Sequence, residues 1–175
     1  MNSELRMIVA GGGTGGHFFP AQAIIKSLRA EGVYVKYMGS QYGIESTYHD
    51  KNDKDVTLLN IRGIQRHLSL NSLAINCLFP WRFMQSYIKS RKIINEFQPH
   101  VVIGTGGYSS GIPLLAAIHQ DVKTIIHEQN SYPGVTTRQL GEKVDKICIA
   151  FNDALKYLKK KMLFLQGILF ERISN

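Results

Sequence analysis

The sequence predicts an α/β fold in which a doubly wound parallel sheet is covered by helices on both faces. Short apolar runs rich in β-branched residues alternate with segments of helical length. Such runs, separated by helix-length segments, are typical of parallel strands buried between two helix layers. The expected strands are residues 5–10, 33–39, 56–61, 101–104, 123–128 and 146–150. A length of 175 residues, with 44% hydrophobic and 19% charged residues, fits a single globular domain.

Composition limits the classes of function. The amino-terminal apolar run has only four residues before the glycines, and nowhere do about 18 apolar residues follow one another, so we expect a cytosolic chain without a membrane span. Cys77 and Cys148 lie far apart in apolar sequence, and we expect them to be buried free thiols. The net charge of +8 indicates an anionic partner, such as nucleic acid, an acidic membrane or a phosphorylated substrate.

A glycine-rich loop follows the first expected strand, where residues 9–21 read VAGGGTGGHFFPA. Gly11, Gly13 and Gly16 satisfy G-x-G-x-x-G, and Pro20 is expected near the first turn of a helix that runs to about Ala30. Glycine amides and a helix N-terminus both favour anions, so the loop is predicted to hold phosphate.

Two other interpretations of this loop are weaker. A dinucleotide-binding oxidoreductase would need an acidic residue after the second strand to bind a ribose. That place reads MGSQYG, with no acid before Glu45. A tight turn without a ligand needs one or two glycines, and this loop has more.

Polar motifs also follow the fourth and fifth expected strands. Residues 104–113 read GTGGYSSGIP, a second anion-binding turn in which Ser109 and Ser110 add hydroxyl donors. Residues 127–130 read HEQN, four side chains that can hydrogen-bond or titrate. Because the carboxyl ends of parallel strands meet at one edge, all three motifs are predicted to face one cleft.

At these motifs the sequence resembles the amino-terminal domain of the MurG family of bacterial transferases, glycosyltransferase family 28. GGTGGHFFPA at 12–21, GTGGYSSGIP at 104–113 and HEQN at 127–130 occur in that family's order and spacing, and the likeness runs from about Arg6 to about Tyr157. The family transfers N-acetylglucosamine from UDP-N-acetylglucosamine to the undecaprenyl-pyrophosphoryl-muramyl-pentapeptide lipid of peptidoglycan synthesis. The resemblance implies a Rossmann-like half of a GT-B architecture, which binds the acceptor while a carboxyl-terminal domain holds most of the donor. It implies no cofactor.

The acceptor hydroxyl needs a base near neutral pH, a role suited to histidine. The resemblance assigns this role to His17, the alternatives being a helix cap or acceptor binding only. Glu128 is expected either to share that proton transfer or to be a carboxylate satisfied by backbone N–H groups, and His127 is a candidate orienting residue. The expected donor-binding residues are Thr14, Gly15, Gly16 and Asn130. The expected acceptor pyrophosphate-binding residues are Gly13, Gly106, Gly107, Tyr108, Ser109 and Ser110.

Metal chemistry is not expected. The six histidines show no paired ligand spacing. Asp53 and Asp55 match the D-x-D of metal-dependent sugar transferases only formally, since they precede an expected strand instead of following one. We interpret them as part of a solvated turn.

The excess positive charge is concentrated in one stretch of the sequence. From Arg62 through Asn95 there is no Asp or Glu, and the middle of this stretch reads CLFPWRFM at 77–84. Basic residues flanking aromatic ones are typical of a patch that docks on an anionic membrane surface. The predicted membrane patch consists of Leu78, Phe79, Trp81, Arg82, Lys89 and Lys92.

The patch predicts peripheral attachment to a membrane, and the resemblance implies that the membrane surface is the cytoplasmic face of the cell membrane. The alternative is that a helix after Pro80 buries its aromatic residues. Both hold if Phe83, Tyr87 and Ile94 face the core while Trp81, Met84 and Ile88 face outward. Nucleic acid is disfavoured because no recognition motif is present.

The last residues depart from the family pattern. We expect an acceptor domain at 1–160, a divergent tail at 161–175 and no donor-binding domain. In LQGILFERI, Gly167 is retained where the family has Gly-Asn-Pro-x-Arg, but Glu171 stands at the arginine position, with Arg172 next to it. The chain is therefore expected to be a weak or inactive enzyme alone. The alternatives are a lipid-pyrophosphate-binding membrane module without turnover, or a subunit of a split transferase with a separate donor-domain partner.

Overall fold

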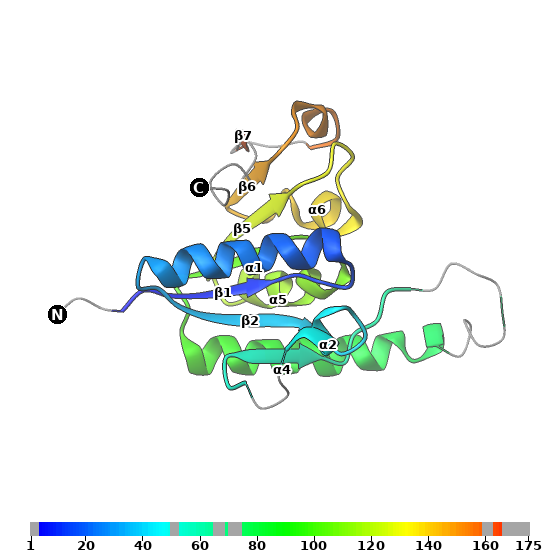
Figure 1. The fold of residues 1–175 in the computed structure, drawn as a ribbon. Helices are drawn as coiled ribbons and strands as arrows, with labels where there is room; N and C mark the ends of the chain where they lie inside the picture. The colour runs from blue at the N-terminus through cyan, green and yellow to red at the C-terminus, as the bar shows by residue number, and fades with distance from the viewer. Residues whose placement is uncertain (1–3, 50–52, 65–68, 70–74, 159–162, 166–175) are drawn as a thin grey trace.

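The computed structural model describes residues 4–49, 53–64, 69, 75–158 and the backbone of 163–165. Its centre is a sheet of seven parallel strands in the order β3-β2-β1-β4-β5-β6-β7 (Figure 1). The order reverses between β1 and β4, as in doubly wound folds, so the predicted fold class is confirmed. The strands are β1 Arg6–Ala10, β2 Tyr34–Ser40, β3 Val56–Leu59, β4 Val101–Gly104, β5 Lys123–Glu128, β6 Lys146–Ile149 and β7 Leu163–Leu165.

All the expected strands are present, and β7 is an addition. It pairs with β6 inside the stretch that was expected to be a divergent tail. Gly167, Glu171 and Arg172 lie outside the described residues.

Helices cover both faces of the sheet. They are α1 Gly15–Ala30, α2 Glu45–Tyr48, α4 Phe79–Phe97, α5 Tyr108–Ile118 and α6 Val135–Leu140, with a 3-10 helix η1 at Asn152–Tyr157. Successive strand residues point to opposite faces, so Val9 packs with Phe18 of α1, whereas Ile8 packs with Leu114 of α5 and Ile94 of α4. Figure 1 shows α1 in front of the strands and α5 behind them.

Helix α1 begins earlier than the sequence predicted. Thr14 has an extended backbone and its carbonyl accepts the N–H groups of His17 and Phe18, so the helix starts at Gly15. Pro20 therefore lies inside the helix, where it has no N–H to donate to the carbonyl four residues back. His17 consequently stands in the first turn of α1, at the carboxyl edge of the sheet.

The expectation for the cysteines is half right. Both are free thiols. Cys148 in β6 is partly buried, which raises the pKa of its thiol. Cys77 is exposed, because it lies just before α4 on the solvent side of the chain.

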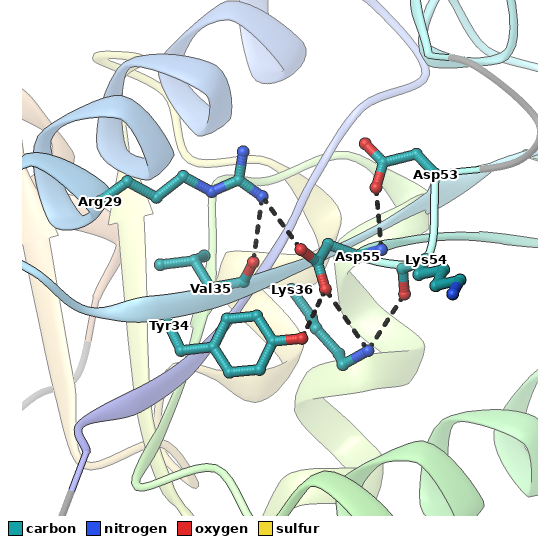
Figure 2. A network of polar contacts seen from close by, with 7 residues as sticks. All are labelled: Arg29, Tyr34, Val35, Lys36, Asp53, Lys54 and Asp55. Carbon is teal, nitrogen blue, oxygen red and sulfur yellow. Dashed lines mark hydrogen bonds and ion pairs between the residues drawn. The ribbon is translucent and has the colours of Figure 1, made fainter.

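At the opposite edge from the loops, Asp55 ties the amino ends of β2 and β3 to the end of α1 (Figure 2). Its carboxylate accepts a 2.9 Å hydrogen bond from the Tyr34 hydroxyl and lies 3.6 Å from Lys36 Nζ. Arg29 of α1 reaches the same carboxylate at 4.0 Å and donates to the Val35 carbonyl at 3.2 Å. The stretch at Asp53 and Asp55 is therefore a structural turn, more engaged than the solvated turn expected from the sequence.

We predict that Asp55→Asn costs about 1 kcal/mol of unfolding free energy, since it weakens one hydrogen bond and two partly exposed ion pairs. The substitution should also lower the pKa of Tyr34, which the hydrogen bond to the Asp55 carboxylate raises. Urea unfolding and NMR titration of Tyr34 measure the two effects. Asp153→Asn, which breaks an exposed ion pair with Lys156, is the matched control and should leave both quantities unchanged. Equal effects of the two substitutions would contradict this account of Asp55.

Candidate functional site

The three motifs meet at one edge of the sheet, as predicted. They follow β1, β4 and β5, which are adjacent, and the register aligns Ala10 with Gly104 and Gly104 with Ile126. The first two loops are in contact, because a Cβ atom at Gly107 would overlap the carbonyl oxygen of Gly12. The chain thus brings together the sequence features that were expected to share a site.

The His17 side chain lies on the second glycine loop. Its Nδ1 is 3.1 Å from the carbonyl oxygen of Thr105, and the Thr105 hydroxyl donates back to the His17 carbonyl at 2.8 Å. Cβ atoms at Gly106 and Gly107 would lie 2.7 and 3.1 Å from the imidazole ring. Both glycines have positive φ, 93° and 74°. These two glycines therefore provide the space in which the ring of His17 lies.

Gln129 joins all three loops and was not among the residues predicted from the sequence. Its Nε2 donates to the carbonyl of Gly16 at 2.6 Å and to that of Thr105 at 2.9 Å. The same atom lies 2.6 Å from Nδ1 of His17. The carbonyl of Gly16 is the one that Pro20 leaves without a helical donor. A proline four residues after a glycine in the first helix turn was the available signal for a side-chain donor here.

Glu45 organises the first glycine loop. Its side chain is fully buried, and its carboxylate accepts the N–H of Gly13 at 2.9 and 3.0 Å and that of Ser40 at 2.7 Å. Cβ atoms at Gly12 and Gly43 would overlap this carboxylate, and one at Gly39 would overlap the Tyr37 hydroxyl and Cγ of Glu45. The Gly13 N–H, predicted to bind a pyrophosphate, is therefore already occupied by an internal anion.

Other side chains of the protein fill the space beside most of the remaining glycines. Gly11 leaves room for the hydroxyl of Thr105, Gly13 for the ring of Tyr108 and Gly15 for the ring of Phe19. Tyr108 is half-buried, which raises the pKa of its hydroxyl. Only Gly16, among the glycines of residues 11–16, has nothing within 4 Å of its missing Cβ. Of the expected donor-binding residues, Thr14, Gly16 and Asn130 are exposed at this edge and Gly15 is partly buried.

Glu128 orders the segment that follows β5. It is almost fully buried, and its carboxylate accepts the backbone N–H groups of Asn130 at 3.1 Å and Gly134 at 3.0 Å. The Asn130 side chain donates to it at 2.8 Å and the Thr137 hydroxyl at 2.6 Å. This geometry favours the interpretation of a satisfied structural carboxylate. The neighbouring His127 is also buried, and desolvation lowers its pKa.

The two serines of the second loop do not present their hydroxyls to solvent. Ser109 and Ser110 are fully buried, and the Ser110 hydroxyl donates to the carbonyl of Gly107 at 3.1 Å. The expectation that these hydroxyls are offered to a pyrophosphate is therefore wrong for the described structure. Helix α5 begins at Tyr108 and carries both serines inward, against the sheet.

The predicted membrane patch divides between the two faces of α4. Leu78, Trp81, Met84 and Ile88 are 48–64% exposed. Phe79 is instead partly buried and packs against the core together with Phe83 and Tyr87, so it offers less exposed surface to the patch than was expected.

The cations of the patch are anchored differently. The Arg82 guanidinium lies over the ring of Tyr42, with 5.5 Å to the centroid. Lys89 donates to the carbonyl of Leu58 at 3.2 Å, and Lys92 lies 3.7 Å from Glu96. Trp81, Met84 and Ile88 form an exposed stripe along α4. Beside it is an open groove lined by Gln41, Asn60, Gln85, Ser86, Ile88, Lys89 and Lys92.

The glycine geometry gives a matched pair of substitutions. Gly12→Ala should lower the unfolding free energy by at least about 2 kcal/mol, because φ is +142° and the new methyl group overlaps the Glu45 carboxylate. Gly16→Ala should stay within about 0.5 kcal/mol of the wild type, because its Cβ enters open space at a helical position. Denaturant unfolding measures both. Similar losses for the two variants would contradict the proposed packing of the loop.

Comparisons with known proteins show the family of the chain. The glycosyltransferase family 28 N-terminal domain matches residues 7–149. A protein of Pediococcus pentosaceus named UDP-N-acetylglucosamine--N-acetylmuramyl-(pentapeptide) pyrophosphoryl-undecaprenol N-acetylglucosamine transferase is 41% identical over 93% of this chain and 44% of its own length. A protein of the same name from Latilactobacillus sakei is 42% identical over 91% of this chain and 45% of its own.

The fold has a solved counterpart. MurG of Acinetobacter baumannii superposes with a TM-score of 0.73 at 24% identity, over 93% of this chain and 45% of that protein. The chain therefore spans less than half the length of the relatives it matches. The matched residues 7–149 include all three loops, and the chain belongs to glycosyltransferase family 28, of which it has the N-terminal domain.

Proposed function

We propose that this chain is the acceptor-binding and membrane-docking half of an N-acetylglucosaminyltransferase of peptidoglycan synthesis. The donor would be UDP-N-acetylglucosamine and the acceptor an undecaprenyl-pyrophosphoryl-muramyl-pentapeptide, the substrates in the names of the relatives. The observation that carries the proposal is the position of His17, held by Thr105 and Gln129 where the three loops meet.

The chemistry assigned to His17 is general-base catalysis. If its Nδ1 donates to the carbonyl of Thr105, the neutral ring has its lone pair on Nε2. Nε2 would take the proton of the acceptor hydroxyl as the oxygen bonds to the anomeric carbon and the bond from that carbon to UDP breaks. Thr105 supports this role by accepting from Nδ1, and Gln129 supports it by joining the carbonyls of Gly16 and Thr105 beside the ring. Glu128 acts indirectly in this proposal, by ordering the segment that includes Asn130.

The donor side is proposed to be completed by a second domain. Thr14, Gly15 and Gly16 lie at the exposed end of α1, and Asn130 lies on the neighbouring loop. A donor domain, in the same polypeptide or as a separate partner, would close over this edge and stabilise the leaving UDP. Residues 1–160 are the proposed acceptor domain.

Membrane docking is supported by charge and by exposed apolar surface. No helix in the described part of the chain is long and apolar enough to cross a bilayer. The exposed stripe of α4 places Trp81, Met84 and Ile88 beside Lys89 and Lys92. Apolar side chains enter the interface and cations near anionic headgroups each add about 1 kcal/mol, which suits reversible attachment.

We predict that the purified chain alone transfers little or no sugar. The loss of even one hydrogen-bond donor that stabilises the transition state typically lowers kcat about 100-fold. Adding the carboxyl-terminal domain of a relative in trans should produce transfer. In that mixture His17→Gln should lower kcat by about 100-fold or more. His100→Gln, which changes an exposed histidine at the amino end of β4, should retain activity.

Robust transfer by the chain alone would contradict the half-enzyme assignment. Equal activity of the two histidine variants would contradict the role of His17, and acceptor binding without transfer would favour the non-catalytic module.

A second prediction concerns phosphatidylglycerol vesicles, which the chain should bind reversibly at low salt. Trp81→Ser with Met84→Ser should weaken binding at every salt concentration, because it removes apolar area worth about 25 cal/mol per Å². Lys89→Gln with Lys92→Gln should mainly flatten the salt dependence. Lys26→Gln with Lys143→Gln makes the same change in charge at exposed positions outside α4 and should have a smaller effect. Failure of the wild type to co-sediment, or identical behaviour of all variants, would refute the patch.

A further inference from the structure

We propose that Glu45 determines the anion specificity of the first glycine loop. Its carboxylate occupies the position on the Gly13 amide that a ligand phosphate would take, and it thereby weakens the binding of free phosphates. Both carboxylate oxygens lie within 3.0 Å of the Gly13 nitrogen, and one also accepts the N–H of Ser40. Backbone amides of a glycine-rich loop directed at an anionic oxygen are the geometry by which such loops bind phosphate.

The glycines around Glu45 are suited to this internal anion. Gly12 and Gly13 have φ of +142° and +85°, conformations that turn the chain around the carboxylate. Gly12 and Gly43 stand on two different loops, and a side chain at either would displace the carboxylate. The Glu45 carboxylate therefore explains why positions 12 and 43 carry no side chain, and a bound ligand is not needed to explain it.

The hydrogen bonds to the Glu45 carboxylate come from backbone N–H groups. Among the described residues, no lysine or arginine lies within ion-pair distance of its carboxylate. The side chain is fully buried, where charges are weakly screened. An anion that approaches the outer face of the loop is therefore repelled by a like charge beneath it.

Such a charge discriminates between ligands. A free phosphate or pyrophosphate gains only contacts to its own oxygens, so the repulsion is uncompensated. A ligand whose pyrophosphate is attached to further groups can offset the repulsion through those groups. The biological use of this selectivity rests on the proposed function, whereas the effect of Glu45 on free anions does not.

The test is titration with inorganic pyrophosphate, followed by calorimetry and by the backbone amide shifts of residues 11–16. Glu45→Gln keeps the shape of the side chain and an oxygen for the amides but removes the charge. We expect it to bind pyrophosphate at least about tenfold more tightly than the wild type, with shifts at Gly13. Glu31→Gln makes the same change in net charge at an exposed position and should bind like the wild type. Binding by Glu45→Gln that is no tighter than by Glu31→Gln would overturn the proposal.

A second variant keeps the test valid if the first is poorly folded. Glu45→Ala leaves the amides of Gly13 and Ser40 without their partner, and pyrophosphate should raise its melting temperature more than that of Glu31→Ala. Equal rises would refute the proposal. Neither measurement involves a sugar donor or a lipid. A lack of transferase activity alongside a positive result here would count against the proposed function alone.

Discussion

The bond between the Glu45 carboxylate and the amides of Gly13 and Ser40 holds the carboxyl edge of the sheet together. It joins the loop after β1 to the end of β2 and to the short helix α2. A buried carboxylate is tolerated only when its oxygens are hydrogen-bonded, and here backbone N–H groups supply those bonds. The requirement also applies in reverse, because the carboxylate fits only if positions 12 and 43 carry no side chain.

A second constraint acts on the same edge through Pro20 and Gln129. The proline removes one helical hydrogen bond from the first turns of α1, and the Gln129 amide replaces it from the loop after β5. The same amide reaches the loop after β4. His17 lies between these two contacts, so its ring is positioned by three segments that are distant in sequence. The site is thereby built on loops but fixed by hydrogen bonds between them.

The sequence predicted the features that follow from local pattern and from the geometry of parallel sheets. Buried strands read as continuous apolar runs, and the three polar motifs converge because their strands are adjacent. The missed features depend on which distant side chain fills a given space. Nothing local to Gly12 shows that Glu45 lies against it, and nothing local to Ser109 shows that α5 turns this residue inward. Phe79 and Trp81 looked equivalent in sequence, yet the helix places them on opposite faces.

The central claim is that the glycine loop is organised around an internal carboxylate. Amide hydrogen exchange of the free protein tests it most directly, since the claim concerns one N–H group. The Gly13 amide should be strongly protected, because it donates to a buried acceptor, whereas the Gly16 amide at the exposed first turn of α1 should exchange rapidly. Rapid exchange at Gly13, at a rate similar to that of Gly16, would contradict the account.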